Sequence, residues 1–289
     1  MSDNQIGTQH PLSLLAHEAY TLFSELGFEI TSGPECETEW YNFDALNVPK
    51  DHPARDMQDT FYVKSSSSPD HEKKDFPDDF KTKRTSSELS LERSSDLLVG
   101  DSDGRGQTIS KDNSDSVSDR SNNRVLRTHN TNTTARVLER VAKENLKEFA
   151  SISIGKVFRN EATDATHEMQ FFQIDGCMLG ENISLASMKA VLIEFYKKVL
   201  GENVEIEFRP SFFPFTEPSV EVHAKWNGKW LEMMGGGMIH PNVLRNAGLD
   251  PEKIQGFAFG GGLDRIAMIK WGIPDVRLFY QGDVRLNQF

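Results

Sequence analysis

Apolar residues recur with the period of a helix in three stretches of the 289-residue chain. Residues 11–26 place their apolar side chains on one helical face, and Gly27 is suited to end that helix. A second helix is predicted to begin at Thr131 or Asn132 as its N-cap, and a third to begin after Ser184. The residues expected to face the core are Leu12, Leu15, Ala19, Phe23 and Leu26 in the first helix, Leu138, Ala142 and Leu146 in the second, and Met188, Leu192 and Phe195 in the third.

Alternation of apolar and polar residues predicts strands between these helices. In GKVFRNEATDATHEMQFFQIDG, strands over roughly 152–159 and 168–176 flank a polar loop, so we expect a hairpin with one face that lines a site. A second hairpin is predicted at Asn227-Gly228, a strong two-residue turn signal. Near the C-terminus, GFAFGGGLDRIAM (256–268) has the pattern of a strand, three glycines and a helix.

Local patterns alone also permit interpretations without function. Arg159 and Glu161 would then form a surface ion pair and Phe171 would belong to the core, because such pairs and core aromatics are common. The glycine-rich junction lets the backbone approach a ligand and directs helix amides at an anion, but by itself it usually indicates close packing. It lacks the lysine of a phosphate-binding loop and the glycine spacing of a dinucleotide site.

Residues 64–124 differ in composition from the rest of the chain. They are rich in Ser, Asp, Lys and Arg and have few large apolar residues. Such a segment cannot bury enough apolar surface to offset its ordering entropy, so we expect a disordered insertion between residues 1–63 and 125–289. A partner-binding segment, a phosphorylation target and a neutral insertion all remain possible roles.

Charge and cysteine content narrow the class of protein. The net charge of -12 argues against a dedicated nucleic-acid module, although a local patch or a partner chain could still contact RNA. Cys36 and Cys177 are too few for a disulfide scaffold and fit a reducing compartment. The sequence shows neither a signal pattern nor an apolar run that could span a bilayer, so we expect a cytoplasmic protein without membrane contact.

The central hairpin resembles motif 2 of class II aminoacyl-tRNA synthetases, and closely that of the bacterial-type phenylalanyl-tRNA synthetase alpha chains. The first helix and the strand after it resemble motif 1, and residues 256–268 are similar to motif 3. Except for the insertion, the resemblance runs from about His10 to the C-terminus and includes HPARDMQDTFYV (52–63), RTH (127–129), FRPSFFPFTEPS (208–219) and GKWLEMMGGGMIHPNVLR (228–245). It implies an α+β fold with a mainly antiparallel sheet flanked by helices. Residues 1–63 and 125–289 would be the two parts of this catalytic domain.

The family resemblance also implies a reaction. L-Phenylalanine would attack the α-phosphate of ATP to give phenylalanyl-adenylate, and the acyl group would then pass to tRNA(Phe). Such chemistry needs positioning and charge neutralisation more than a protein nucleophile. The resemblance assigns catalysis to Arg159 and Arg265, and ATP binding to these two arginines together with Glu161, His167 and Phe171.

For the amino acid, the resemblance implies a phenyl pocket and an ammonium site. The phenyl pocket would be formed by Phe213 and Phe215, with Ala258 as its floor. The ammonium group would be bound by His129, Thr131, Gln173 and Asp175. Two of these residues depart from the family, in which Ser usually stands at Thr131 and Glu at Asp175. The shorter Asp175 puts the amino-group contact in question.

Metal and partners also follow from the resemblance alone. A Mg²⁺ ligand is implied at Glu217, with Glu232 as the second candidate acid. The assembly would be a heterotetramer of two alpha and two beta subunits that binds tRNA. The chain begins without the N-terminal arm by which such alpha chains reach tRNA, which predicts either truncation or altered tRNA binding. The alternative hypothesis is a synthetase paralogue that does not charge tRNA and has a regulatory or binding role.

Overall fold

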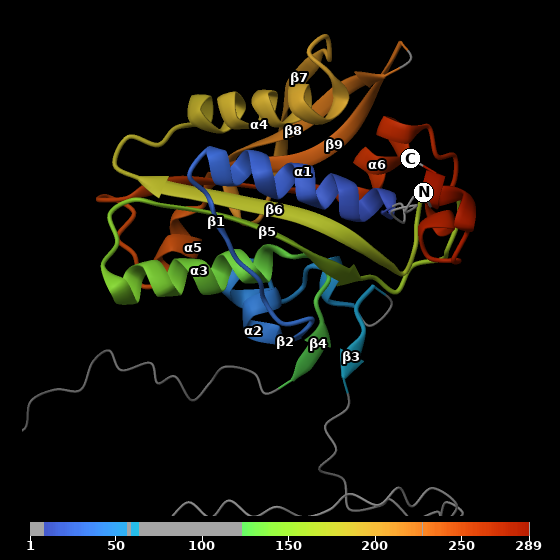
Figure 1. The fold of residues 1–289 in the computed structure, drawn as a ribbon. Helices are drawn as coiled ribbons and strands as arrows, with labels where there is room; N and C mark the ends of the chain where they lie inside the picture. Colours follow the sequence, from blue (N-terminus) through green and yellow to red (C-terminus); the bar gives the residue numbers. More distant parts are fainter. Residues whose placement is uncertain (1–8, 57–58, 64–122, 227, 289) are drawn as a thin grey trace, which may run out of the picture. The chain divides into compact units, whose positions relative to one another are not determined.

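A seven-stranded sheet forms the centre of the chain in the computed structural model, which describes residues 9–56, 59–63, 123–226 and 228–288 (Figure 1). The strand order is β1-β5-β6-β10-β9-β8-β7. Only β1 and β5 are parallel, and every other neighbouring pair is antiparallel. The strands are β1 (Glu29–Ile30), β5 (Phe149–Phe158), β6 (Gln170–Gly180), β10 (Gln255–Gly262), β9 (Lys229–Ile239), β8 (Thr216–Trp226) and β7 (Ile206–Phe213).

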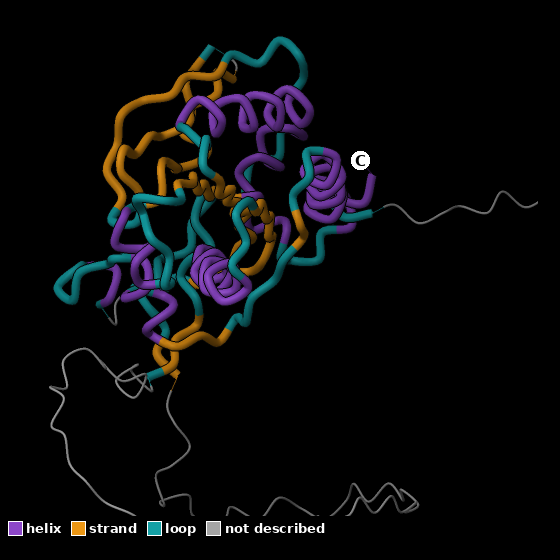
Figure 2. Tube along the Cα trace, turned by 90° about the vertical axis from the view of Figure 1, so that its left-hand side faces the viewer, coloured by secondary structure: helices purple, strands orange, loops and turns teal. Residues whose placement is uncertain are grey.

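Helices cover both faces of this sheet, as the view turned by 90° also shows (Figure 2). On one face α1 (Pro11–Glu25), α4 (Leu185–Leu200) and α6 (Leu263–Trp271) contribute to one apolar core. On the other face α2 (Glu39–Asn42), α3 (Thr131–Glu144) and α5 (Pro241–Asn246) contribute to a second core. The α+β class with a mainly antiparallel sheet is therefore confirmed.

A second, smaller sheet of order β2-β4-β3 joins segments from either side of the insertion. Its strands are antiparallel: β2 (Cys36–Thr38), β4 (Arg124–Leu126) and β3 (Tyr62–Val63). Four short 3-10 helices complete the described chain: η1 (Asp44–Leu46), η2 (Pro53–Arg55), η4 (Val276–Phe279) and η5 (Val284–Gln288). In the part of the chain that the structure describes, no helix is both long and apolar enough to span a membrane.

Local chemistry explains most of the element boundaries. In α1, Pro11 occupies the first turn and the helix ends before Gly27, whose φ of 84° is accessible to glycine without strain. Ser184 caps α4 through a capping box with Ser187, as the pattern predicts. The second hairpin also forms, because Trp226 pairs with Lys229 across the turn, of which residue 227 lies outside the described residues.

Several boundary predictions were wrong. Thr131 is the first residue of α3 rather than its cap, because Asn130 takes the N-cap position without a side-chain hydrogen bond. Leu26 was expected in the core but is 39% exposed, since α1 ends one residue earlier. Arg124, placed in the expected insertion, is the first residue of β4. The remaining insertion, residues 64–122, lies outside the described residues, as do 57 and 58.

Candidate active site

A cavity of about 860 Å³ opens over the middle of the large sheet. Strands β6, β10 and β9 form its floor, and the loop after β5 and helix α6 contribute its two sides. Twelve of the fourteen residues singled out from the sequence line it: His129, Thr131, Arg159, Glu161, His167, Phe171, Gln173, Phe213, Phe215, Glu232, Ala258 and Arg265. The two that do not are Asp175 and Glu217.

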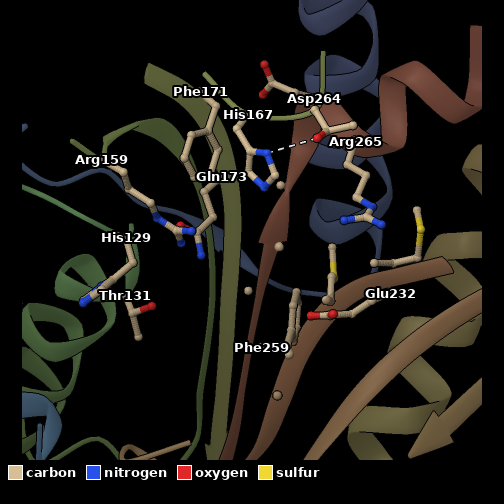
Figure 3. A pocket seen from close by; sticks show the side chains of 18 of the residues that line it. His129, Thr131, Arg159, His167, Phe171, Gln173, Glu232, Phe259, Asp264 and Arg265 are labelled. Atoms are coloured by element: carbon tan, nitrogen blue, oxygen red, sulfur yellow. Dashed lines mark hydrogen bonds between the residues drawn. The ribbon is translucent and has the colours of Figure 1, made fainter. Parts of the chain in front are cut away.

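The two arginines reach the cavity from opposite sides (Figure 3). Arg159 follows β5, and its Nε donates to the backbone oxygen of Thr128 at 3.3 Å. Its guanidinium lies 5.0 Å from the centre of the Phe171 ring and 3.9 Å from a Glu161 oxygen, so both neighbours hold it only loosely. Arg265 lies on α6 and makes no hydrogen bond or ion pair to the rest of the described chain. Both positive charges can therefore meet an anion that enters the cavity.

The polar loop between β5 and β6 is organised by one carboxylate. Asp164 accepts hydrogen bonds from the backbone N–H of Thr166 at 2.7 Å and of His167 at 2.8 Å. The Nδ1 atom of His167 lies 3.0 Å from the same carboxylate. These bonds, the one from Thr166 first, hold the pKa of Asp164 well below its ordinary value. The exposed Asp164 thus stays ionised and orients the His167 ring.

His129 is neutral, and its lone pair lies on a buried nitrogen. Its Nε2 lies 2.9 Å from the backbone carbonyl oxygen of Asn42, which can only accept, so this nitrogen carries the proton. Burial, and then the charge of Arg159, lower the pKa of His129 to about 4. Its Nδ1 has no hydrogen-bond partner among the described residues. This nitrogen is buried, so His129 lines the cavity with other atoms of its side chain.

The resemblance implied that Asp175 binds the substrate's ammonium group. In the structure Asp175 lies behind the cavity wall and does not line the cavity. Its side chain is buried, and its Oδ1 accepts a hydrogen bond of 2.7 Å from the hydroxyl of Thr131, which does line the cavity. The other oxygen, Oδ2, has no partner within the described chain. Burial raises the pKa of Asp175 to about 7 against the opposing effect of the Thr131 hydrogen bond.

Two aromatic rings, those of Phe213 and Phe215, form an apolar wall of the cavity. The rings of Phe213 and Phe215 lie nearly parallel, with centroids 5.9 Å apart and 8° between their planes. Gly235 leaves space for the first ring, because a Cβ at this position would lie 2.6 Å from its Cζ. Ala258 pairs with Gly237 on β9 and with Cys177 on β6, so the floor beside the rings is built from small groups.

Glu217 stands apart from the cavity. The resemblance implied a Mg²⁺ ligand here; 73% of the Glu217 side chain is exposed, and its Oε2 lies 3.2 Å from the Nε2 atom of His240. The neighbouring Thr216 and Ser219 point inward instead, and their hydroxyls bond each other at 2.8 Å. Within the residues that the structure describes, no group of three His, Cys, Asp or Glu side chains could hold a metal ion.

Sequence reasoning missed three features of the lining. Asp264, directly before Arg265, is buried and lines the cavity, and burial raises its pKa to about 6. Met233 and Met234 bring flexible apolar side chains from β9, next to Glu232, which was named only as a possible metal ligand. The one signal for Asp264 in the sequence is an acidic residue in the first turn of a helix that follows three glycines.

Comparison with known proteins places these features in a family. Residues 1–289 match the model of the tRNA synthetases class II core domain (F). The chain is 38% identical over 296 residues to the phenylalanine–tRNA ligase alpha subunit of Bacillus pumilus (strain SAFR-032), covering 98% of this chain and 69% of that protein. It is 40% identical over 298 residues to the alpha subunit of the same name from Lysinibacillus sphaericus (strain C3-41), covering 99% of this chain and 69% of that protein.

Proposed function

Because this chain belongs to the family of phenylalanine–tRNA ligase alpha subunits, we propose that it is the catalytic alpha subunit of such a ligase. It would activate L-phenylalanine with ATP and transfer the phenylalanyl group to tRNA(Phe). The observation that carries this proposal is one cavity with an arginine on each of two opposite sides and an apolar aromatic wall between strands β7 and β10. A paralogue without charging activity is not favoured, because the arginines and the apolar wall are all retained.

The arginines would stabilise the charge of the reacting phosphates. As the carboxylate attacks the α-phosphate and pyrophosphate leaves, negative charge is shared between entering and leaving oxygens. Arg159 would bridge the α-phosphate and the carboxylate, and Arg265 would hold the distal phosphates, each by charge-assisted hydrogen bonds. Their loose contacts in the free protein favour this role, since little has to be broken when ATP binds.

The adenine base would stack on Phe171, with Glu161 and His167 beside the nucleotide. One face of the Phe171 ring already has Arg159 within 5.0 Å. The base would therefore use the other face, or Arg159 would move toward the phosphates. The carboxylate of Asp164 keeps the proton of His167 on Nδ1, which leaves Nε2 to meet the ligand.

The ammonium group of the substrate would meet hydrogen-bond acceptors at the end of the cavity that Thr131 and Gln173 line. Gln173 offers a side-chain oxygen that already accepts from the backbone N–H of Asn130 at 3.4 Å, and the neutral His129 ring beside it lines the cavity while its Nδ1 stays buried. Thr131 has committed its own proton to Asp175, so its oxygen faces the cavity as an acceptor. Asp175 would thus act on the ammonium group through Thr131 and by its charge.

Phe213, Phe215 and Ala258 would hold the benzyl side chain in the apolar pocket. Ring contacts of this kind favour an aromatic ligand over an aliphatic one. An apolar pocket rejects an added hydroxyl group only weakly, so we expect tyrosine to be activated at a low level.

Mg²⁺ would accompany ATP, orienting its phosphates and neutralising part of their charge. A resident ion at Glu217 does not fit the described residues, because this exposed carboxylate has only His240 beside it. Such an ion would need further oxygen ligands from water or from another chain. The carboxylates of Glu161 and Glu232 line the cavity and suit a metal that arrives with the nucleotide.

The partners proposed for the chain are a beta subunit, in an assembly of two alpha and two beta chains, and tRNA(Phe). The support is that the relatives are named alpha subunits of a ligase that acts on tRNA. A cytoplasmic location fits this role.

The direct test is phenylalanine-dependent exchange of pyrophosphate into ATP, measured with the chain co-expressed with its beta subunit. Arg159→Ala should lower the exchange rate about a hundredfold or more, the usual effect of removing a group that stabilises developing charge. Arg209→Ala is the matched control, because Arg209 lies outside the cavity in a surface pair with Glu207. Near-normal exchange in Arg159→Ala would refute its role. No exchange by the unaltered protein with any amino acid would favour the regulatory alternative.

A further inference from the structure

Asp264 connects two parts of the nucleotide side of the cavity. It lies in the first turn of α6, beside Arg265, and its buried carboxylate points toward β6 (Figure 3). Its Oδ2 accepts a hydrogen bond of 2.7 Å from the backbone N–H of Phe172. The residues on either side of Phe172 are Phe171 and Gln173, and both line the cavity.

This hydrogen bond lies directly after the last residue pair between β6 and β10. The pairing of β6 with β10 finishes at Gln173 and Gly262, so Phe172 lies just beyond the ladder. Asp264 supplies the acceptor that the ladder no longer provides, and it does so from the helix that carries Arg265. The distance between the Phe171 ring and the Arg265 guanidinium is therefore set partly by this single carboxylate.

Tyr280 contacts the other oxygen of the Asp264 carboxylate. Tyr280 is partly buried, and its hydroxyl donates a hydrogen bond to the Oδ1 of Asp264. Tyr280 follows η4, and the backbone N–H of Val276 in η4 donates to the carbonyl oxygen of Ala165, in the polar loop, at 3.0 Å. One C-terminal segment thus contacts both the loop with His167 and the carboxylate beside Arg265.

We propose that Tyr280, acting through Asp264, is a positioning residue that fixes Arg265 relative to Phe171 and so sets the affinity for ATP. The proposal rests on the proposed function, since it assumes that the nucleotide lies between these two side chains. Tyr280 does not line the cavity, and an effect of its hydroxyl on ATP cannot arise from direct contact.

The test compares Tyr280→Phe with Tyr20→Phe. The hydroxyl of Tyr20 on α1 is also partly buried and accepts a hydrogen bond of 3.1 Å from the backbone N–H of Ile154, but Tyr20 lies away from the cavity. Each variant loses one hydroxyl group that makes a hydrogen bond to another element: Tyr20 to Ile154 in β5, and Tyr280 to Asp264 in α6. In ATP–pyrophosphate exchange, Tyr280→Phe should raise the KM for ATP about tenfold, the change expected when one strong hydrogen bond to a charged group no longer orients the site. The KM for phenylalanine should stay unchanged, and Tyr20→Phe should change neither value.

Asp264→Asn provides the second variant. An asparagine can still accept from Phe172 and donate to the Tyr280 oxygen, so this variant should fold and should change the KM for ATP less than Tyr280→Phe does. An unchanged KM for ATP in Tyr280→Phe, equal rises for ATP and phenylalanine, or the same rise in Tyr20→Phe would each overturn the proposal. Binding of ATP to the full chain, measured by calorimetry, separates this proposal from the proposed function. If the unaltered chain shows no exchange activity but Tyr280→Phe still weakens ATP binding, the proposed ligase function is refuted. The proposed positioning role of Tyr280 is then still supported.

Discussion

Replacing Asp175 by Asn should make the protein more stable and a poorer catalyst. The carboxylate is buried, receives one hydrogen bond from Thr131 and leaves its second oxygen without a partner in the described chain. Asn has nearly the same shape and can keep the bond from Thr131, but it carries no charge. The substitution therefore separates two effects of the buried charge, which are its cost in folding stability and its proposed contribution to binding the substrate's ammonium group.

The magnitude follows from the pKa. Burial raises the pKa of Asp175 from 3.8 to about 7, and one pKa unit corresponds to 1.36 kcal/mol. Because the folded state holds the proton more tightly, stability is highest at low pH and falls as the pH rises to about 7. Above pH 7 the loss amounts to ~4 kcal/mol. The Asn amide leaves N–H groups without an acceptor at a cost of about 1–3 kcal/mol, so we expect a net gain of about 1–3 kcal/mol at pH 8.

Urea unfolding at pH 8 and at pH 4.5 checks this expectation. At pH 4.5 Asp175 is protonated in the folded state and only about 1 kcal/mol of the loss has developed, so the gain from Asn should vanish or become a loss of up to about 2 kcal/mol. Asp250→Asn is the control, since Asp250 is an exposed carboxylate paired with Lys253 and should bring no gain at pH 8. In pyrophosphate exchange at pH 8, Asp175→Asn should raise the KM for phenylalanine about tenfold, the factor that corresponds to 1.4 kcal/mol. A variant less stable than the parent at pH 8, with an unchanged KM for phenylalanine, would refute the reasoning.

Two further substitutions test the apolar pocket. Ala258→Gly should admit para-substituted phenylalanines in the exchange assay, because it deepens the floor, and unchanged selectivity would remove Ala258 from the pocket. Gly235→Ala would place a Cβ 2.6 Å from the Cζ of Phe213, so the ring must shift. The KM for phenylalanine should rise about tenfold while the KM for ATP stays constant, and an equal change in both would indicate general damage to the fold instead.

The elements that the sequence predicted well are those with a strong local signal. Helix α4 has a capping box and an apolar face, and both hairpins have alternating strands around a polar turn. The cavity residues on these elements were found because the resemblance to a family fixed their register. Periodicity alone would have left Phe171 in the core and Arg159 in a surface pair.

The positions of Asp175, Asp264 and Glu217 depend on contacts between distant parts of the chain. Whether Asp175 reaches the cavity is decided by Thr131, which comes from α3 and covers it. The role of Asp264 depends on Phe172 and Tyr280, which belong to a strand and to a C-terminal turn with no shared sequence pattern. Glu217 has apolar neighbours in the sequence, but the inward hydroxyl pair of Thr216 and Ser219 leaves it facing solvent.

The glycines of β9 and β10 serve close packing and the proposed site at the same time. Gly235 and Gly260 are paired across β9 and β10, so both face the same side of the sheet. A Cβ on the first would lie 2.6 Å from Phe213, and a Cβ on the second 2.6 Å from the Oδ1 of Asp175. At either position a side chain would force the neighbouring group to shift, because atoms this close repel strongly. The two glycines are thus needed for close packing, and the groups that pack against them are the aromatic wall and the buried carboxylate of the amino-acid site.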